Sequence, residues 1–219
     1  MTGGNDRGAE MSDAAEAAPS PRPGPLPPPQ DSQSHRPSDN LRPDGQGPAM
    51  TTNTWQADVF AALKRARIAQ VGYVPDAGHA HLIAAAHADP DIRTTVLTTE
   101  EEGVALAAGA WLGGQRAVLL MQSSGVGNCI NMLSLPVSCR MPFLTLVTMR
   151  GEWGEFNPWQ IPMGTATPAV LTAAGVHVRR ADRADEAAET VAAAAAMGFA
   201  TCVPVAVLFS QRLIGAKVF

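Results

Sequence analysis

Short runs of consecutive apolar residues recur along this chain, and each run is followed by a segment in which apolar residues have helical spacing. The clearest runs are 117–121 and 203–209, which contain no polar side chain. A strand without polar alternation is buried on both faces, which is typical of a parallel sheet covered by helices. The pattern therefore predicts an α/β fold, with a six-stranded, mostly parallel, doubly wound sheet and helices on both faces.

The same pattern gives approximate bounds for the elements. Strands are predicted at 68–74, 93–98, 117–121, 142–149, 176–180 and 203–209, and helices at 55–66, 79–87, 100–112, 128–138, 168–174 and 182–197. Residues 122–127 and 150–167 are predicted as loops. Ligands of open α/β sheets bind outside the carboxyl ends of the strands, so the segments that follow the strands are the first place to look for a site.

The first fifty residues differ from the rest, because they hold 10 of the 18 prolines and no aromatic residue. Such a segment cannot bury enough apolar surface to offset the entropy of ordering. We expect residues 1–50 to be a disordered tail and 51–219 to be one domain. The alternative explanation for the tail is a start codon placed too far upstream. The composition of the tail is not typical of a signal peptide.

Charge and cysteine content narrow the class of protein. A net charge of −4 argues against nucleic acid as a partner. The three cysteines are odd in number and lack metal-ligand spacing, so we expect reduced thiols in a cytoplasmic protein. Residues 191–209 carry no charge, but Gly198 and Pro204 interrupt them. We therefore interpret them as a helix, a turn and a buried strand, and expect no membrane span.

The acidic cluster Glu100-Glu101-Glu102 opens one predicted helix. Thr99-x-x-Glu102 matches a capping box, in which the Thr and Glu side chains satisfy free backbone N–H groups. That pattern gives Glu102 a structural role. Glu100 is left at the first helical position, at the carboxyl edge of the sheet, where its carboxylate can face a ligand or a second subunit.

Two further segments admit both a functional and a structural interpretation. Gly125-Val126-Gly127 after a strand is a weak match to a dinucleotide fingerprint, because Ile130 stands where the third glycine belongs; the segment either binds an anion or is a tight turn. Residues 150–163 include two of the four tryptophans, which suggests an interface or a cover over a site, against a self-packed surface loop. Arg150 there either binds an anionic substrate or forms an ion pair.

Residues 99–110 and 121–128 together resemble the pyrimidine-binding domain of thiamine-diphosphate enzymes. In particular they look like sulfopyruvate decarboxylase α subunits and the amino-terminal part of phosphonopyruvate decarboxylases. Val74-Pro75-Asp76 and residues 160–164 are similar to the same family. The resemblance covers nearly the whole chain from Trp55 onward.

The resemblance implies roles for particular residues. The family's cofactor-activating glutamate precedes a helix glycine by nine positions, which from Gly109 gives Glu100, with Glu101 and Glu102 as alternatives. The residues implied to bind the cofactor are Glu100, Gln122, Ser123, Ser124 and Gly125. The substrate is expected near Asp76 and Gln122, and we add Arg150 as an inferred anion ligand.

The family binds diphosphate and a divalent metal through a Gly-Asp-Gly signature, which does not occur here. The resemblance therefore implies thiamine diphosphate as cofactor, no metal site in this chain, and a β subunit that holds the diphosphate and Mg²⁺. The implied activity is decarboxylation of phosphonopyruvate, sulfopyruvate or a similar 3-substituted pyruvate, releasing CO2 and an aldehyde. The alternatives are a non-catalytic paralogue with the same fold and interface, and a Rossmann-type oxidoreductase.

Overall fold

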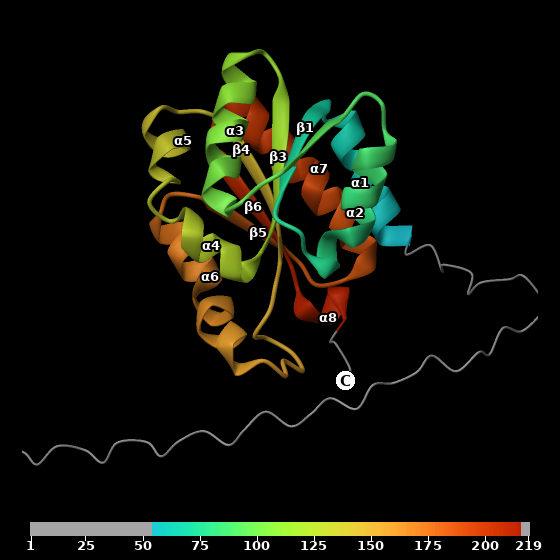
Figure 1. Ribbon diagram of the computed structural model, residues 1–219, viewed down its shortest axis with the longest axis vertical. Helices are drawn as coiled ribbons and strands as arrows, with labels where there is room; N and C mark the ends of the chain where they lie inside the picture. Colours follow the sequence, from blue (N-terminus) through green and yellow to red (C-terminus); the bar gives the residue numbers. More distant parts are fainter. Residues whose placement is uncertain (1–53, 216–219) are drawn as a thin grey trace, which may run out of the picture. The chain divides into compact units, whose positions relative to one another are not determined.

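The computed structural model describes residues 54–215 of the chain (Figure 1). The predicted tail at 1–50 lies outside the described residues. The described part is a six-stranded sheet with the order β2-β1-β3-β4-β6-β5. Every neighbouring pair of strands is parallel, so the predicted fold class is confirmed. The strands are β1 Ile68–Tyr73, β2 Arg93–Val96, β3 Arg116–Gln122, β4 Phe143–Thr148, β5 His177–Ala181 and β6 Pro204–Phe209.

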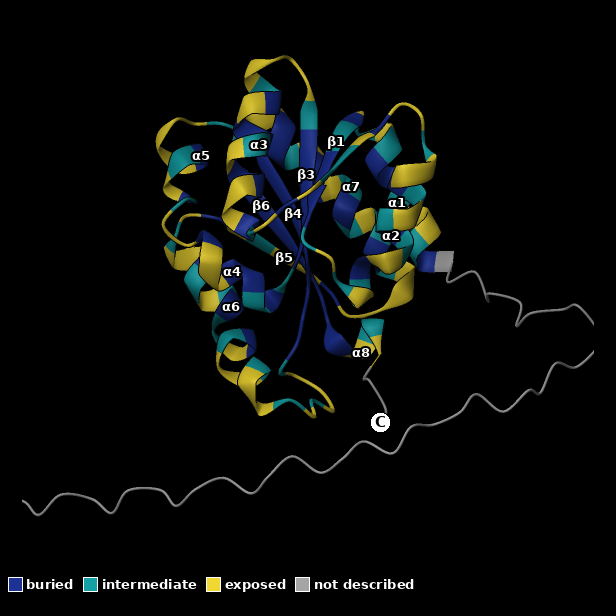
Figure 2. Ribbon diagram, viewed as in Figure 1, coloured by how far each residue is buried: buried dark blue, intermediate teal, exposed yellow. Residues whose placement is uncertain are grey.

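Helices cover both faces of the sheet, as Figure 1 shows. On one face lie α1 Thr54–Arg65, α2 Ala80–Ala88 and α7 Ala184–Thr201; on the other lie α3 Glu100–Leu112, α4 Ser123–Cys129, α5 Ser134–Ser138 and α6 Ile161–Ala173. Strand β3 explains why both faces need cover. Its Val118 and Leu120 pack in one apolar core, while Leu119 and Met121 pack in the other. The central strands β3, β4 and β6 are accordingly among the most buried parts of the described chain, whereas the edge strands β2 and β5 are largely accessible (Figure 2).

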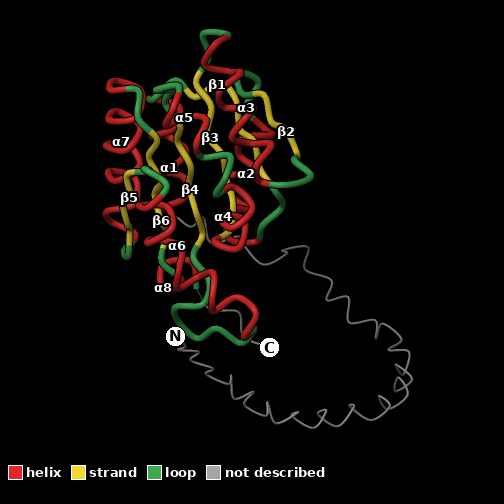
Figure 3. Tube along the Cα trace, turned by 90° about the vertical axis from the view of Figure 1, so that its left-hand side faces the viewer, coloured by secondary structure: helices red, strands yellow, loops and turns green. Residues whose placement is uncertain are grey.

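Short elements gather at the carboxyl edge of the sheet. These are η1 Ala77–His79 after β1, η2 Pro158–Gln160 before α6, and α8 Gln211–Ile214 after β6. In the view turned by 90°, α8 and the segment between β4 and α6 lie together beyond the ends of the strands (Figure 3). This edge includes the point between β1 and β3 where the strand order reverses, which is the usual ligand site of such sheets.

The prediction of a loop at 122–127 was wrong, because β3 runs to Gln122 and α4 begins at Ser123 without a connecting loop. The glycines that suggested a loop permit close helix packing instead: a Cβ on Gly125 would overlap the side chain of Glu100. The predicted helix at 128–138 was also wrong in part, since α4 ends at Cys129 and α5 begins only at Ser134.

The segment 150–167 is less irregular than predicted, because α6 already begins at Ile161. Pro162 occupies the first turn of α6, where the missing N–H is tolerated, but Pro168 lies inside the helix. Residues 191–209 form the end of α7, a turn and β6, as expected. Among residues 54–215, no helix is both long enough and apolar enough to cross a membrane.

Candidate active site

Polar side chains from three adjacent strand ends meet at the carboxyl edge of the sheet. Asp76 follows β1, Gln122 ends β3 and Thr148 ends β4. Gln122 Nε2 donates to Asp76 Oδ1 at 3.0 Å, and Thr148 Oγ1 donates to Asp76 Oδ2 at 2.7 Å. Ser124 Oγ donates to Gln122 Oε1 at 2.9 Å, which extends the chain of hydrogen bonds into α4. Both oxygens of Asp76 thus have donors, and its carboxylate is held in one orientation.

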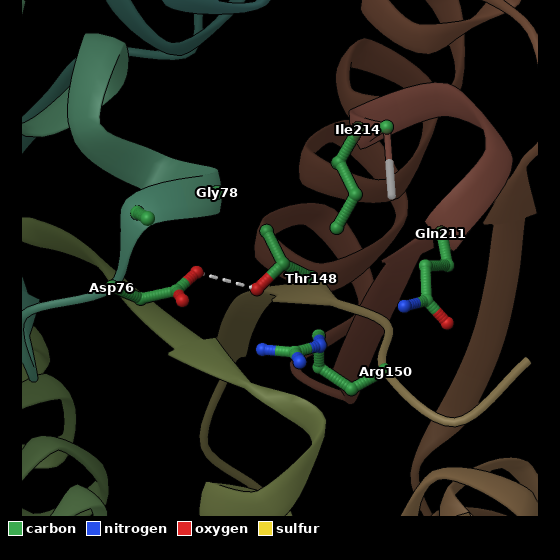
Figure 4. Close-up of a pocket in the computed structure, with 8 residues that line it drawn as sticks. Asp76, Gly78, Thr148, Arg150, Gln211 and Ile214 are labelled. Carbon is green, nitrogen blue, oxygen red and sulfur yellow. Dashed lines mark hydrogen bonds between the residues drawn. The ribbon is translucent and has the colours of Figure 1, made fainter. Parts of the chain in front are cut away.

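A cavity of about 170 Å³ opens beside Asp76 (Figure 4). It is lined by Asp76, Ala77, Gly78, Thr148, Arg150, Gln211, Ile214 and Gly215. The close-up shows the guanidinium of Arg150 directed toward Thr148 and Asp76, with Gln211 and Ile214 on the far side. The structure thus brings together the three residues that were predicted to meet the substrate, because Gln122 contacts Asp76 directly.

Arg150 forms the ion pair that was the structural alternative for this residue. Its Nε and Nη2 donate to the two carboxylate oxygens of Glu155 at 2.7 Å and 2.6 Å. Glu155 also accepts from the backbone N–H groups of Gly151 and Asn157 and from Gln211 Nε2. Arg150 lowers the pKa of Glu155 to about 2, and these further donors contribute. The loop after β4 is therefore built around one nearly buried carboxylate.

The lowered pKa of Glu155 predicts that the stability of the fold depends on pH in the acid range. A carboxylate with a lowered pKa in the folded state stabilises the fold above its usual pKa of 4.5, and this stabilisation is lost as the pH falls toward about 2. We expect Glu155→Gln to lower the free energy of unfolding by about 3 kcal/mol at neutral pH. The difference from wild type should shrink below about pH 4.5 in urea unfolding curves.

The matched control is Glu189→Gln, which makes the same change at an exposed position of α7. The free energy of unfolding of this variant should equal that of the wild type at every pH tested. A stability difference at Glu155 that stays constant between neutral pH and about pH 2 would contradict the proposed role of its charge.

Glu100 begins α3 and lies beside the first turns of α4, with 8% of its surface exposed. Asn128 Nδ2 donates to its Oε2 at 2.8 Å. Among the residues that the structure describes, Oε1 has no hydrogen-bond donor. The absence of a side chain at Gly125 lets the carboxylate lie against the backbone of α4. The result is a nearly buried carboxylate with one oxygen held and the other free to accept a hydrogen bond.

The neighbouring glutamates differ from Glu100, because both are exposed. Glu102 Oε2 accepts from the backbone N–H of Thr98 at 2.9 Å, and the side chain of Thr99 makes no capping bond. The predicted capping box was therefore wrong in detail, although Glu102 does satisfy a backbone donor at the start of the helix. Burial distinguishes Glu100 as the member of the cluster that is shielded from water.

Ser123, also predicted to face the cofactor, is fully buried, and its Oγ accepts from the backbone N–H of Arg150 at 3.1 Å. Sequence reasoning missed Asn128, Thr148 and Gln211. Thr148 and Gln211 lie at or just beyond the carboxyl ends of β4 and β6, so the rule that selected Asp76 could have found them. No spacing signal marked the contact between Asn128 and Glu100.

No family model matches the chain. It is 36% identical over 151 residues to sulfopyruvate decarboxylase subunit alpha of Methanothermobacter thermautotrophicus, a match that covers 68% of this chain and 92% of that protein. The corresponding subunit of Methanocaldococcus jannaschii is 33% identical over 152 residues, which is 69% of this chain and 90% of that protein. Phosphonopyruvate decarboxylase of Streptomyces viridochromogenes is 38% identical over 117 residues, 52% of this chain and 30% of that enzyme.

Among solved structures, 2-oxoglutarate:ferredoxin oxidoreductase from Magnetococcus marinus superposes with a TM-score of 0.61 at 14% identity, covering 73% of this chain and 29% of that one. At that identity the likeness concerns the fold alone. The sequence relatives show the class of protein: the chain is placed among the decarboxylases. Within that class, it belongs to the family of sulfopyruvate decarboxylase α subunits. The resemblance predicted from the sequence is confirmed.

Proposed function

We propose that this chain is the α subunit of a two-subunit, thiamine-diphosphate-dependent 2-oxo acid decarboxylase. Its substrate is phosphonopyruvate, sulfopyruvate or a similar 3-substituted pyruvate, and its products are CO2 and an aldehyde. The observation that carries the proposal is the state of Glu100, a nearly buried carboxylate at the carboxyl edge of the sheet with one oxygen unbonded among residues 54–215.

The surroundings of Glu100 fit the aminopyrimidine ring of the cofactor. When bound, thiamine diphosphate supplies the carbon nucleophile and the electron sink for decarboxylation. Glu100 Oε1 would hold a proton at the ring nitrogen N1′, while Asn128 keeps the carboxylate from turning. Such a charge-assisted bond is stronger where little water is present, and only 8% of Glu100 is exposed. Gln122 and Ser124, which are partly exposed, complete the proposed cofactor surface, and the buried Ser123 and Gly125 support it from within.

The proposed substrate residues are Asp76, Gln122 and Arg150. Asp76 and Gln122 form a fixed polar pair at the end of β1 and β3, next to the cavity. The Nε and Nη2 atoms of Arg150 are committed to Glu155, whereas Nη1 has no acceptor in the described part of the chain. We assign this free donor to an anionic group of the substrate, since a guanidinium N–H bonds carboxylate, sulfonate and phosphonate oxygens.

A β subunit completes the site in this proposal, and it supplies the diphosphate and Mg²⁺ ligands. Two observations support a partner. The relatives are named as α subunits. The segment from the end of β4 to the first residue of α6, much of which Figure 2 colours as exposed, also carries accessible apolar side chains: 54% of Trp153, 50% of Phe156, 86% of Trp159 and 43% of Ile161 are accessible. Exposed aromatics of this density are typical of protein interfaces, and we assign this surface to the β subunit.

The test is reconstitution. The purified chain alone is expected to bind thiamine diphosphate negligibly by calorimetry and to release no CO2 from any of the proposed substrates. Addition of the β subunit should produce turnover. Trp159→Ser should weaken assembly by about tenfold or more, because it removes a large apolar contact. The control is Leu112→Ser, which changes a 75% exposed apolar residue at the end of α3 that lies away from Glu100. This variant should assemble normally.

Two results would count against the proposal. Tight cofactor binding by the isolated chain would contradict the divided site. Normal assembly without decarboxylation of any 2-oxo acid would favour the non-catalytic paralogue instead.

A further inference from the structure

His79 directly follows the cavity-lining residues Ala77 and Gly78 and is itself buried, with 1% of the residue exposed. It ends η1, the short turn that follows Asp76. Its Nε2 lies 3.2 Å from the carbonyl oxygen of Met121 in β3 and 3.0 Å from that of Leu146 in β4. One ring nitrogen therefore bridges two central strands of the sheet close to their carboxyl ends.

The two acceptors determine the tautomer of His79. A carbonyl oxygen only accepts hydrogen bonds, so Nε2 must carry the hydrogen. The other nitrogen, Nδ1, is buried without a partner among the described residues, so a second proton there would have no acceptor. Burial lowers the pKa of His79, against a smaller opposing effect of the Asp76 charge. The ring is consequently neutral and serves as a fixed N–H donor.

The turn that His79 holds is the wall of the cavity formed by Asp76, Ala77 and Gly78. At its start, the Asp76 carboxylate is bonded to Gln122 and Thr148; at its end, His79 is bonded to Met121 and Leu146. Between them, a Cβ on Gly78 would lie 2.7 Å from Thr148 Cγ2, so the turn is already pressed against β4. A shift of the imidazole would therefore shift the wall.

We propose that His79 is a positioning residue for the substrate cavity, a role that rests on the proposed decarboxylase function. Its Nε2–H holds the Asp76–Gly78 wall against β3 and β4, and so sets where the Asp76 carboxylate meets the substrate. His79 does not touch the substrate itself. It acts on substrate binding through Asp76, which distinguishes it from a residue that merely fills the core.

The test compares His79→Leu and His79→Gln in the reconstituted complex. Leucine keeps an apolar side chain but removes the donor; glutamine can place an amide N–H near the position of Nε2. We expect His79→Leu to raise KM about tenfold with kcat within about threefold, and His79→Gln to restore KM to within about threefold of wild type. The control is His87→Leu, which also removes two side-chain hydrogen bonds of a histidine, to Tyr73 and Thr94. His87 is exposed and does not line the cavity, so the KM of this variant should not change.

A second measurement does not depend on activity. With ¹⁵N-labelled histidine rings in the full chain, His79 should show the neutral Nε2–H tautomer from about pH 5.5 to 8. An Nδ1–H tautomer or a titrating ring would overturn the assignment. So would an unchanged KM in His79→Leu with only a lower melting temperature. If the wild-type complex decarboxylates no 2-oxo acid, the proposed function fails, whereas the tautomer still tests how His79 is held.

Discussion

Replacing Glu100 with glutamine is expected to lower kcat of the reconstituted decarboxylase by about 10²- to 10⁴-fold. The reason lies in the two oxygens of Glu100. Oε2 is held by Asn128, and Oε1 is the acceptor that we assign to the cofactor ring. An uncharged amide would still fill the space and bond Asn128, but it would not hold a proton at the ring nitrogen with comparable strength. Steady-state CO2 release with saturating cofactor measures the loss.

The control for Glu100→Gln is Glu101→Gln, which removes the same charge from the next residue at an exposed position. It should retain nearly full activity. Both variants should assemble with the β subunit, as judged by size-exclusion chromatography, because glutamine keeps the size of each side chain and can still accept the hydrogen bond from Asn128 at position 100. Full activity of Glu100→Gln would sink the assignment, and a large loss in Glu101→Gln would transfer the role to its neighbour.

The sheet was predictable from the sequence because its central strands β3, β4 and β6 are buried on both faces and are mostly apolar. In β3, Leu119 and Met121 face one core while Val118 and Leu120 face the other. A strand with apolar side chains on both faces needs a cover on both faces, which a parallel sheet between two layers of helices provides. Asp76 was predictable as a site residue by a general rule on strand ends. The hydrogen bond between Asp76 and Thr148 was not predictable, because the two residues are 72 positions apart and are brought together by strand pairing rather than by any spacing.

The errors have a common origin in tertiary packing. Gly125 and Gly127 lower the helical tendency of their segment, and taken locally they favour a turn. In the folded chain the glycines let α4 lie close to Glu100 and to Met163, so the segment is helical. A Cβ on Gly164 would likewise overlap the backbone carbonyl of Arg150, so this glycine lets α6 lie close to that residue. The helix propensities of single residues do not reflect such contacts between distant parts of the chain.

Replacing Gly125 with alanine is expected to have a second large effect on the rate of decarboxylation. A Cβ built on Gly125 overlaps the carboxylate of Glu100, so Gly125→Ala must displace that side chain. Glu100 would lose its bond to Asn128 and its placement toward the cofactor. Misplacement of a catalytic group by about 1 Å costs on the order of 10²-fold in rate, and we expect kcat to fall by about that factor. Alanine is a better helix former than glycine, so the helix itself should tolerate the change.

Gly127→Ala is the matched control, two residues further along α4. Its added Cβ would lie 3.2 Å from Met163 Sδ, the end of a flexible side chain that can move aside. We therefore expect near-normal kcat for Gly127→Ala and a hundredfold loss, to order of magnitude, for Gly125→Ala, with both variants still folded by circular dichroism. Equal activity in the two variants would mean that the fit of Glu100 against α4 does not determine the rate. Unfolding of Gly125→Ala alone would assign the glycine to stability, and Glu100→Gln would then carry the test of the catalytic role.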